Sequence, residues 1–156
     1  MFLVNDTKGE RRKKITGFLD SGEPAVAVLL AAANFEWTVR RTIIALGKSP
    51  TARFTEENGI FRHCSGLKKY EKVWEKEFFP SPLERLPDVI RNWVFFRDKA
   101  YPLRHKLIHG AQGTTGQDYA KDRVEAMLAA SEGLIECGQR YGVDVFQKIK
   151  IRRKPR

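Results

Sequence analysis

Cysteine and long apolar runs are both scarce in this chain of 156 residues. The two cysteines, Cys64 and Cys137, lie far apart and show no metal-ligand or redox spacing, which argues against a disulfide framework. The longest apolar run, residues 25–33, has about half the length that crosses a bilayer. The chain turns polar at Asn5, so we expect no signal peptide. These scarcities predict a soluble cytoplasmic protein with reduced thiols and no membrane association.

Strand alternation, internal repeats and low-complexity tracts are also missing, apart from weak alternation over residues 143–151. With 42% hydrophobic and 31% charged residues, the composition is that of a globular chain of one-domain length. Apolar residues recur instead at helical spacing over several segments. The sequence therefore predicts an all-α fold, a bundle of four or five helices.

Proline and glycine set the expected helix limits. Pro24 begins a helix that Gly47 ends, and its first part is apolar all round, which predicts the central buried helix. Further helices are expected over residues 66–79, over 83–107 with kinks at Pro87 and Pro102, and from Gln117 to about residue 137, with a short one near 51–57. Residues 1–20 are expected to form a flexible or weakly helical basic lead-in, residues 21–147 the domain, and residues 148–156 a tail.

Acidic residues are outnumbered, with 29 Lys and Arg against 19 Asp and Glu, giving a net charge of +10. Most of this excess lies in the tail, because residues 148–156 hold six basic side chains and no acidic one. We expect a nucleic-acid-binding arm there, with a solubilising end or a partner-docking segment as alternatives. Its basic residues are Lys148, Lys150, Arg152, Arg153, Lys154 and Arg156.

Two of the three histidines, His105 and His109, lie in one short segment with Arg104. On a helix these three side chains point to roughly 0°, 100° and 140° from Arg104, away from the face of the neighbouring leucines. Imidazole exchanges protons near neutral pH, and guanidinium binds two phosphate oxygens. Because RNA carries its own nucleophile, the 2′-hydroxyl, this set suits metal-free RNA cleavage.

The segment Arg104-His105-Lys106-Leu107-Ile108-His109 resembles the R-x4–6-H motif of the HEPN superfamily, and the helical chain around it, from about residue 23 to 141, is similar in kind. The resemblance implies a metal-independent endoribonuclease that needs no cofactor. It further implies a homodimer whose motif helices share one cleft. Arg104 would bind the scissile phosphate, His109 would act as general base or acid, and His105 would support the site.

By the same resemblance, RNA is the expected substrate, the product a 2′,3′-cyclic phosphate, and an antitoxin or regulatory partner possible, since members act as toxins or in defence. Alternatives remain open. The motif could be a solvated helix end whose cations complement the helix dipole, within a helical module that binds RNA or protein without cleaving. A zinc site would need His63 or a cysteine besides the histidine pair, and no metal is expected. A helical DNA-binding protein is a weaker possibility, since no helix-turn-helix pattern is present.

Two further residues, Glu36 and Arg40, are accessory candidates because one of them could reach the motif helix and orient Arg104. Their i, i+4 spacing more simply predicts an ion pair within one helix. The three tryptophans, Trp37, Trp74 and Trp93, are expected in the core rather than as base-stacking platforms.

Overall fold

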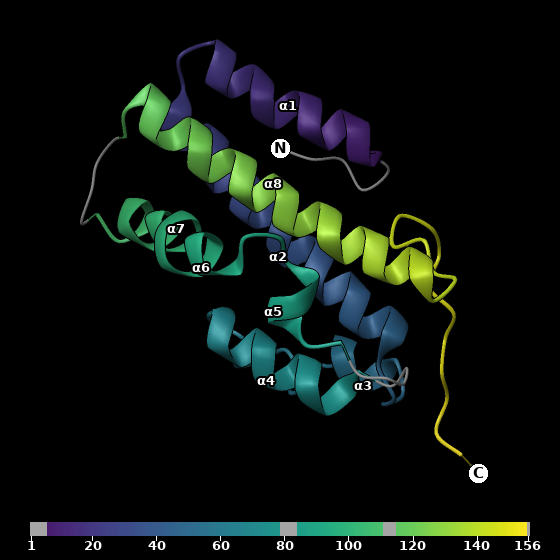
Figure 1. Ribbon diagram of the computed structural model, residues 1–156. Helices are drawn as coiled ribbons and strands as arrows, with labels where there is room; N and C mark the ends of the chain where they lie inside the picture. Colours follow the sequence, from purple (N-terminus) through teal and green to yellow (C-terminus); the bar gives the residue numbers. More distant parts are fainter. Residues whose placement is uncertain (1–5, 79–83, 111–114, 156) are drawn as a thin grey trace.

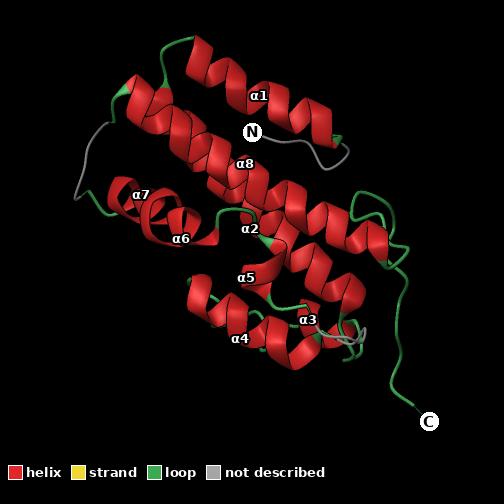
Figure 2. Ribbon diagram, viewed as in Figure 1, coloured by secondary structure: helices red, strands yellow, loops and turns green. Residues whose placement is uncertain are grey.

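Helix α2 (Pro24–Leu46) is the centre of an all-α bundle in the computed structural model, which describes residues 6–78, 84–110 and 115–155 (Figure 1). Helix α8 (Gln117–Arg140) lies along α2, and α1 (Lys8–Asp20) packs against both. Helices α4 (Leu67–Glu77) and α7 (Tyr101–Ile108) contact α2 as well. The prediction of an all-α helical bundle is confirmed, and no described residue belongs to a strand (Figure 2).

Both ends of α2 are where the sequence places them. Pro24 lies in the first turn, and the Gly47 N–H donates to Ile43 O at 2.7 Å as the helix ends. Glycine is required at this end, because a Cβ would lie 2.6 Å from Ile43 O and 3.0 Å from the Phe54 ring. Ala27, Val28, Ala31 and Ala32 are buried, whereas Val26 and Ala33 are exposed, so the apolar first half is buried on one side and not all round as expected. Across the described residues, no helix is both long and apolar enough to cross a membrane.

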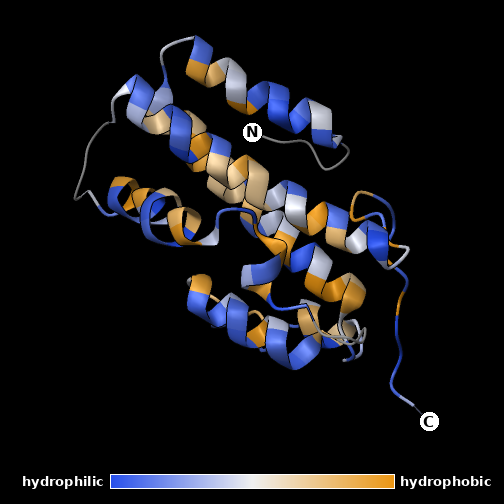
Figure 3. Ribbon diagram, in the orientation of Figure 1, coloured by the Kyte–Doolittle hydropathy of each residue, from blue (hydrophilic) through white to orange (hydrophobic). Residues whose placement is uncertain are grey.

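The segment expected to be flexible or weakly helical is instead helix α1, and that expectation was wrong. Thr7 and Glu10 form a reciprocal capping box at its start, which satisfies backbone N–H groups that the helix leaves unpaired. Ile15 and Leu19 lie in the core, and Arg11 is buried at 3% exposure. The helix is otherwise hydrophilic (Figure 3), which explains why its apolar pattern is too sparse to predict packing.

The segment expected as one kinked helix over residues 83–107 is divided into four short elements. They are α5 (Leu86–Val89), α6 (Trp93–Phe95), the π-helix η1 (Phe96–Ala100) and α7. Asn92 adopts φ +52° between α5 and α6, a left-handed conformation that asparagine tolerates better than most residues. The expected helix is thus interrupted at Asn92, which lies between the two expected kinks at Pro87 and Pro102.

The π turn lies where Pro102 would disturb a regular α-helix. Proline has no N–H, and its ring clashes with the carbonyl four residues earlier, here that of Asp98. The backbone widens at this point, and the Tyr101 N–H donates to Phe96 O, five residues back. Phe96, Ala100, Tyr101 and Leu103 are buried on both sides of the turn. The extra residue therefore keeps the apolar side of α7 against α2 and α8.

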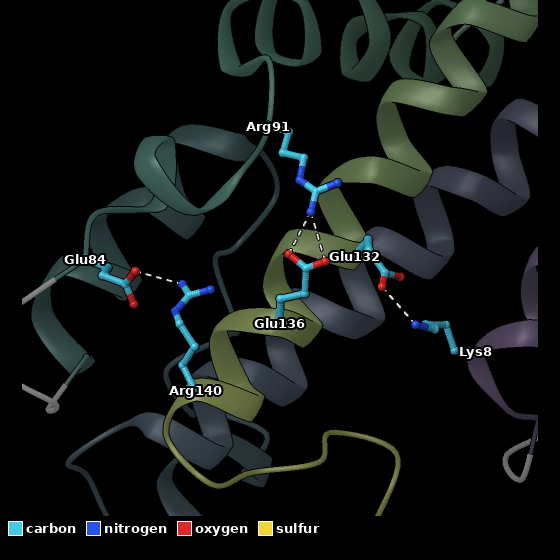
Figure 4. Close-up of polar contacts among 6 residues, drawn as sticks. All are labelled: Lys8, Glu84, Arg91, Glu132, Glu136 and Arg140. Atoms are coloured by element: carbon cyan, nitrogen blue, oxygen red, sulfur yellow. Dashed lines mark hydrogen bonds and ion pairs between the residues drawn. The ribbon is translucent and has the colours of Figure 1, made fainter.

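Of the smaller expectations, the short helix near residues 51–57 is confirmed as α3 (Ala52–Thr55). The weak strand pattern over residues 143–151 is wrong, because that segment has no regular structure. Helix α8 approaches α5 closely at Gly133, where a Cβ would lie 2.3 Å from Val89 O. Surface ion pairs join α8 to its neighbours, as Figure 4 shows for Lys8 with Glu132, Arg91 with Glu136 and Arg140 with Glu84.

Candidate active site

The motif residues occupy helix α7 and the turn that ends it. Leu103 is buried and holds the helix on the bundle, while Arg104 and His105 are half-buried and His109 is exposed. His109 is the first residue after the helix, and Gly110 follows with φ +71°, a left-handed conformation that ends the helix. The predicted helix end at His109-Gly110 is therefore confirmed.

The two imidazoles form a stacked pair at the accessible end of α7. The centroids of His105 and His109 lie 5.5 Å apart with an angle of 13° between the rings. Tyr101 meets His105 edge-on, with centroids 6.2 Å apart, and the His109 N–H donates to His105 O at 3.0 Å. The i, i+4 spacing thus places two groups capable of proton transfer side by side, with one of them open to solvent.

Arg104 contacts the central helix α2. Its Nη2 lies 3.3 Å from Glu36 Oε1, and both side chains are 24% exposed. The prediction that Arg104 lies on a face turned from the core needs correction, because the π turn rotates α7 so that Arg104 faces α2. Within one chain, Arg104 therefore lies against α2, whereas the two histidines lie at the accessible end of α7.

Tyr101 completes the anchorage of Arg104. Its hydroxyl donates to Glu36 Oε1 at 2.7 Å, so one carboxylate holds both a tyrosine and an arginine of α7. Burial, together with the hydrogen bond to Glu36, raises the pKa of Tyr101, and the hydroxyl stays a proton donor throughout the neutral range. The carboxylate thereby fixes the position of the Arg104 guanidinium.

Glu36 and Arg40 do not form the expected intrahelical ion pair in the structure. Arg40 Nε instead donates to the Tyr70 hydroxyl of α4 at 2.7 Å, and its guanidinium lies 5.3 Å from the Phe61 ring centroid. Burial is the largest single influence and lowers the pKa of Arg40, but the hydrogen bond to Tyr70 and the charges of Tyr70, Glu36 and Cys64 together outweigh it, so the net shift is upward. The alternative in which Glu36 reaches the motif helix and orients Arg104 matches the structure.

A pocket of about 390 Å³ is lined in part by His105, one of the two stacked histidines. His105, Tyr101 and Pro102 form one wall, and the opposite wall is the start of α4 with Gly66, Lys68 and Lys69, next to Arg97. The N-terminus of α4 carries unpaired N–H groups and a partial positive charge. The pocket therefore offers cations and helix N–H groups to an anion bound beside His105.

Comparison of the chain with protein-family models, curated proteins and solved structures gives no match. Within residues 6–78, 84–110 and 115–155, no group of three or more His, Cys, Asp or Glu residues is placed to hold a metal ion. The cysteines Cys64 and Cys137 are free thiols, half-buried and buried. The chemistry of the site is therefore argued from its own side chains.

The basic tail is partly docked on the body of the protein. Arg152 Nε donates to Ser49 O at 3.0 Å, and its backbone N–H donates to Thr51 Oγ1 at 2.9 Å. Arg41 of α2 holds the segment before it through the carbonyl oxygens of Val145 and Gln147 at 2.6 and 2.5 Å. Lys148, Lys150, Arg153 and Lys154 remain exposed, whereas Arg156 lies outside the described residues. Arg152 is thus a structural contact rather than a free part of the candidate arm.

Three residues that contribute to the site, Tyr101, Lys68 and Lys69, were not predicted from the sequence. Tyr101 lies three residues before Arg104, so helical spacing alone could have indicated that both reach the same partner. Lys68 and Lys69 look like members of a solvated charged face until the structure places them opposite His105. Of the tryptophans, Trp74 is buried as expected, while Trp37 is half-buried beneath Arg11, whose Cζ lies 3.9 Å from its ring centroid.

Proposed function

We propose that this protein is a metal-independent endoribonuclease of HEPN type that acts as a homodimer in the cytoplasm. The observation that carries the proposal is the stacked pair of accessible imidazoles, His105 and His109, directly after the arginine that Glu36 holds in place. Two imidazoles supply a base and an acid near neutral pH, and a fixed guanidinium binds a phosphate with little loss of side-chain freedom.

In the proposed reaction, one imidazole removes the proton from a ribose 2′-hydroxyl. The 2′-oxygen attacks the adjacent phosphorus, the bond from phosphorus to the 5′-oxygen breaks, and a second imidazole gives its proton to the departing oxygen. The products are a 2′,3′-cyclic phosphate and a 5′-hydroxyl. Arg104 stabilises the charge that builds on the phosphate oxygens, and Lys68 and Lys69 hold the neighbouring strand.

Apolar exposure near the motif supports the homodimer. Ile108, on α7 between the histidines, is 51% exposed, and Val94 on α6 is 60% exposed. A second copy packed on this surface would cover both side chains and bring its own Arg104 and histidines to a shared cleft. In a cell, such an activity needs control, and we propose an antitoxin or regulatory partner of a toxin or defence effector.

One observation favours a second candidate, a helical module that binds RNA or a protein partner without cleaving. The ion pair between Arg104 and Glu36, together with the Tyr101 hydrogen bond, is also a sufficient structural reason for Arg104 to be present. In this case the motif arginine serves the fold, and the two histidines complement the carboxyl end of α7.

Cleavage of mixed RNA in excess EDTA separates the two candidates. We expect the intact protein to cut, and Arg104→Ala and His109→Ala to lose about 100- to 10,000-fold in rate. His63→Ala, which removes the one histidine outside the motif, should keep full activity, and circular dichroism should show all variants folded. Cyclic phosphate ends on the products identify the proposed chemistry.

Four outcomes would contradict the proposal in whole or in part. Cleavage that disappears in EDTA would show a need for metal, and cleavage that survives both motif substitutions would place the activity elsewhere. Tight RNA retention without any cleavage would support the binding module. A protein that stays monomeric at high concentration in light scattering would refute the shared cleft while leaving the assignment of the residues open to the kinetic test.

A further inference from the structure

The basic tail is fixed to the bundle at the end of α2 by Arg152. Figure 1 shows the tail as an extended chain that runs past this end of the helix. Arg152 Nε donates to Ser49 O at 3.0 Å, and its Nη1 donates to Ala45 O at 3.4 Å. The backbone adds a reciprocal pair with Thr51, whose N–H donates to Arg152 O at 3.0 Å while its hydroxyl oxygen accepts from Arg152 N–H at 2.9 Å. Around Arg152 the tail is therefore a defined part of the protein surface.

The residues on either side of Arg152 face solvent. In an extended chain successive side chains point to opposite sides, so a residue that faces the protein has neighbours that face outward. Ile151 is 64% exposed, the highest value among the exposed large hydrophobic side chains of the described residues, and Arg153 is exposed as well. The docking of Arg152 thus presents an isoleucine outward at a fixed place on the surface.

Uncompensated positive charge surrounds Ile151. No acidic residue occurs between residues 145 and 156, and Glu77, which contacts the docking site through Ser49, is only 2% exposed. Arg140 on α8 pairs with Glu84, whereas the exposed cations near Ile151 form no ion pair within the described ranges. These cations are Lys148, Lys150, Arg153 and Lys154 of the tail, together with Lys48 beside the docking site. Their charges add above one surface.

We propose that this surface binds the face of an anionic lipid bilayer. The lysines and Arg153 meet the lipid phosphates, and Ile151 enters the boundary between headgroups and acyl chains. Each basic side chain near such a membrane gains free energy from the negative surface potential, and an apolar side chain among them gains by leaving water. The binding is peripheral and needs no spanning segment. The proposal departs from the expectation of no membrane association, which rested on the shortness of the apolar runs.

The composition of the tail favours a bilayer over RNA as the partner. Sites for single-stranded nucleic acid stack bases on aromatic rings, and residues 147–156 contain no aromatic residue. An isoleucine offers no stacking face to a base, and its exposure among cations does not help to bind a phosphate. The same side chain is what a basic segment needs in order to enter a headgroup layer. The expected nucleic-acid-binding arm therefore becomes the competing outcome of the test.

The proposal does not depend on the ribonuclease activity. The tail is held by residues 45–51 at the end of α2, whereas the motif lies on α7 and contacts Glu36. His109→Ala, which should abolish cleavage, should bind vesicles as the original chain does. Failure of one proposal is thus distinguishable from failure of the other.

Sedimentation of the full chain with lipid vesicles tests the proposal. We expect binding to phosphatidylcholine vesicles that contain about 30% phosphatidylserine, and none to pure phosphatidylcholine. Lys148→Gln with Lys150→Gln should lose about 30-fold in affinity for the anionic vesicles. The matched control is Lys99→Gln with Lys121→Gln, which removes the same charge from η1 and the first turns of α8, at the other end of the bundle (Figure 1), and should keep the affinity.

A second variant separates insertion from attraction by charge alone. Ile151→Ser keeps every charge and should lose about tenfold in vesicle affinity, whereas Ile151→Leu should keep it. Raising the salt concentration should weaken the binding of all variants. All substituted side chains are exposed, so melting curves should coincide, and a lysine variant that melts early is replaced by Arg153→Gln with Lys154→Gln.

The proposal is overturned if the protein does not sediment with anionic vesicles, or if it sediments equally with neutral ones. It is also overturned if the Lys148/Lys150 variant or Ile151→Ser binds anionic vesicles as tightly as the original chain. Loss of binding to a short RNA in the Lys148/Lys150 variant, with vesicle binding unchanged, would instead identify the tail as a nucleic-acid-binding arm.

Discussion

Helix α2 carries two polar clusters that face in nearly opposite directions, and they differ in the helices that they contact. Asn34 meets α1 and α8, whereas Glu36, two residues on and about 200° around the helix, meets α7. In the first cluster Arg11 Nη1 lies 3.4 Å from Asn34 Oδ1, and Asn34 Nδ2 lies 3.3 Å from Ser131 Oγ. In the second, Glu36 holds Tyr101 and Arg104.

The difference teaches how the same residue type serves two purposes. Arg11 is 3% exposed and lies between three helices, and burial lowers its pKa, which marks a charge kept at a cost for packing. Arg104 has a side-chain exposure of 24%, and its neighbours Tyr101 and His105 line a pocket, so a ligand can reach its surroundings. The cluster of Arg11, Asn34 and Ser131 is closed to solvent and belongs to the fold. The cluster of Glu36, Tyr101 and Arg104 is open to solvent, and the proposed chemistry takes place beside it.

The largest effect on stability should come from Arg11→Ala. This change removes a guanidinium that covers Trp37 and leaves buried Asn34 short of a donor, so we expect a loss of about 3 kcal/mol in the free energy of unfolding. Urea titration measures it. Arg104→Ala is the matched control, expected to cost about 1 kcal/mol because its surroundings stay partly hydrated. Equal losses for the two arginines would erase the distinction between the clusters.

A smaller effect, with a pH signature, is expected for Tyr101→Phe. At pH 7 the lost hydrogen bond to Glu36 should lower the free energy of unfolding by about 1 to 2 kcal/mol. Since the folded pKa of Tyr101 lies above its ordinary value of 10.0, the unfolded chain ionises first, and this contribution declines as the pH rises above 10.

The gap in stability between the original chain and Tyr101→Phe should therefore narrow from about pH 10 upward, in urea titrations at several pH values. Comparison of the two chains cancels other alkaline titrations, including that of Cys137, whose pKa burial raises to about 12. A gap that is constant or widens with pH would mean that the Tyr101 hydroxyl is not held as a donor in the open cluster.

The smallest effect should come from the surface ion pairs around α8 in Figure 4. Lys8→Ala removes the 2.8 Å contact with Glu132, where the lysine side chain is 50% exposed, and should cost less than about 0.5 kcal/mol. Thermal melting at low and high salt measures it, with Arg91→Ala as a second exposed pair. A loss as large as that of Arg11→Ala would show that α1 is held on the bundle by its surface ion pairs rather than by the buried contact between Arg11 and Asn34.

Much of the fold could be predicted because its signals are local. Pro24 and Gly47 mark the ends of α2, and Gln117 begins α8, as the sequence indicates. Helix α1 could not be predicted from apolar spacing, because its most informative buried residue is the arginine Arg11. Its capping pair, Thr7 and Glu10, was a signal in the sequence that was overlooked.

The candidate site was predictable in composition and less so in arrangement. The spacing of His105 and His109 correctly placed the rings side by side, because that relation depends on one helical turn. The direction of Arg104 depends on the break at Asn92 and the π turn, which no simple periodicity describes. The sequence allowed Glu36 to pair either with Arg40 or with a residue of the motif helix. Tertiary packing selects the partner, which is Arg104.

The π turn before α7 can also be understood in terms of insertions and deletions. One residue more than an α-helix needs is accommodated between Phe96 and Tyr101, and its removal would take away the widening that accommodates Pro102 and shift the register of α7 against α6. Every side chain downstream would then turn by roughly 100°, carrying Arg104 off Glu36 and Leu103 out of the core. The number of residues between Asn92 and Arg104 is therefore constrained as tightly as the identity of the motif itself.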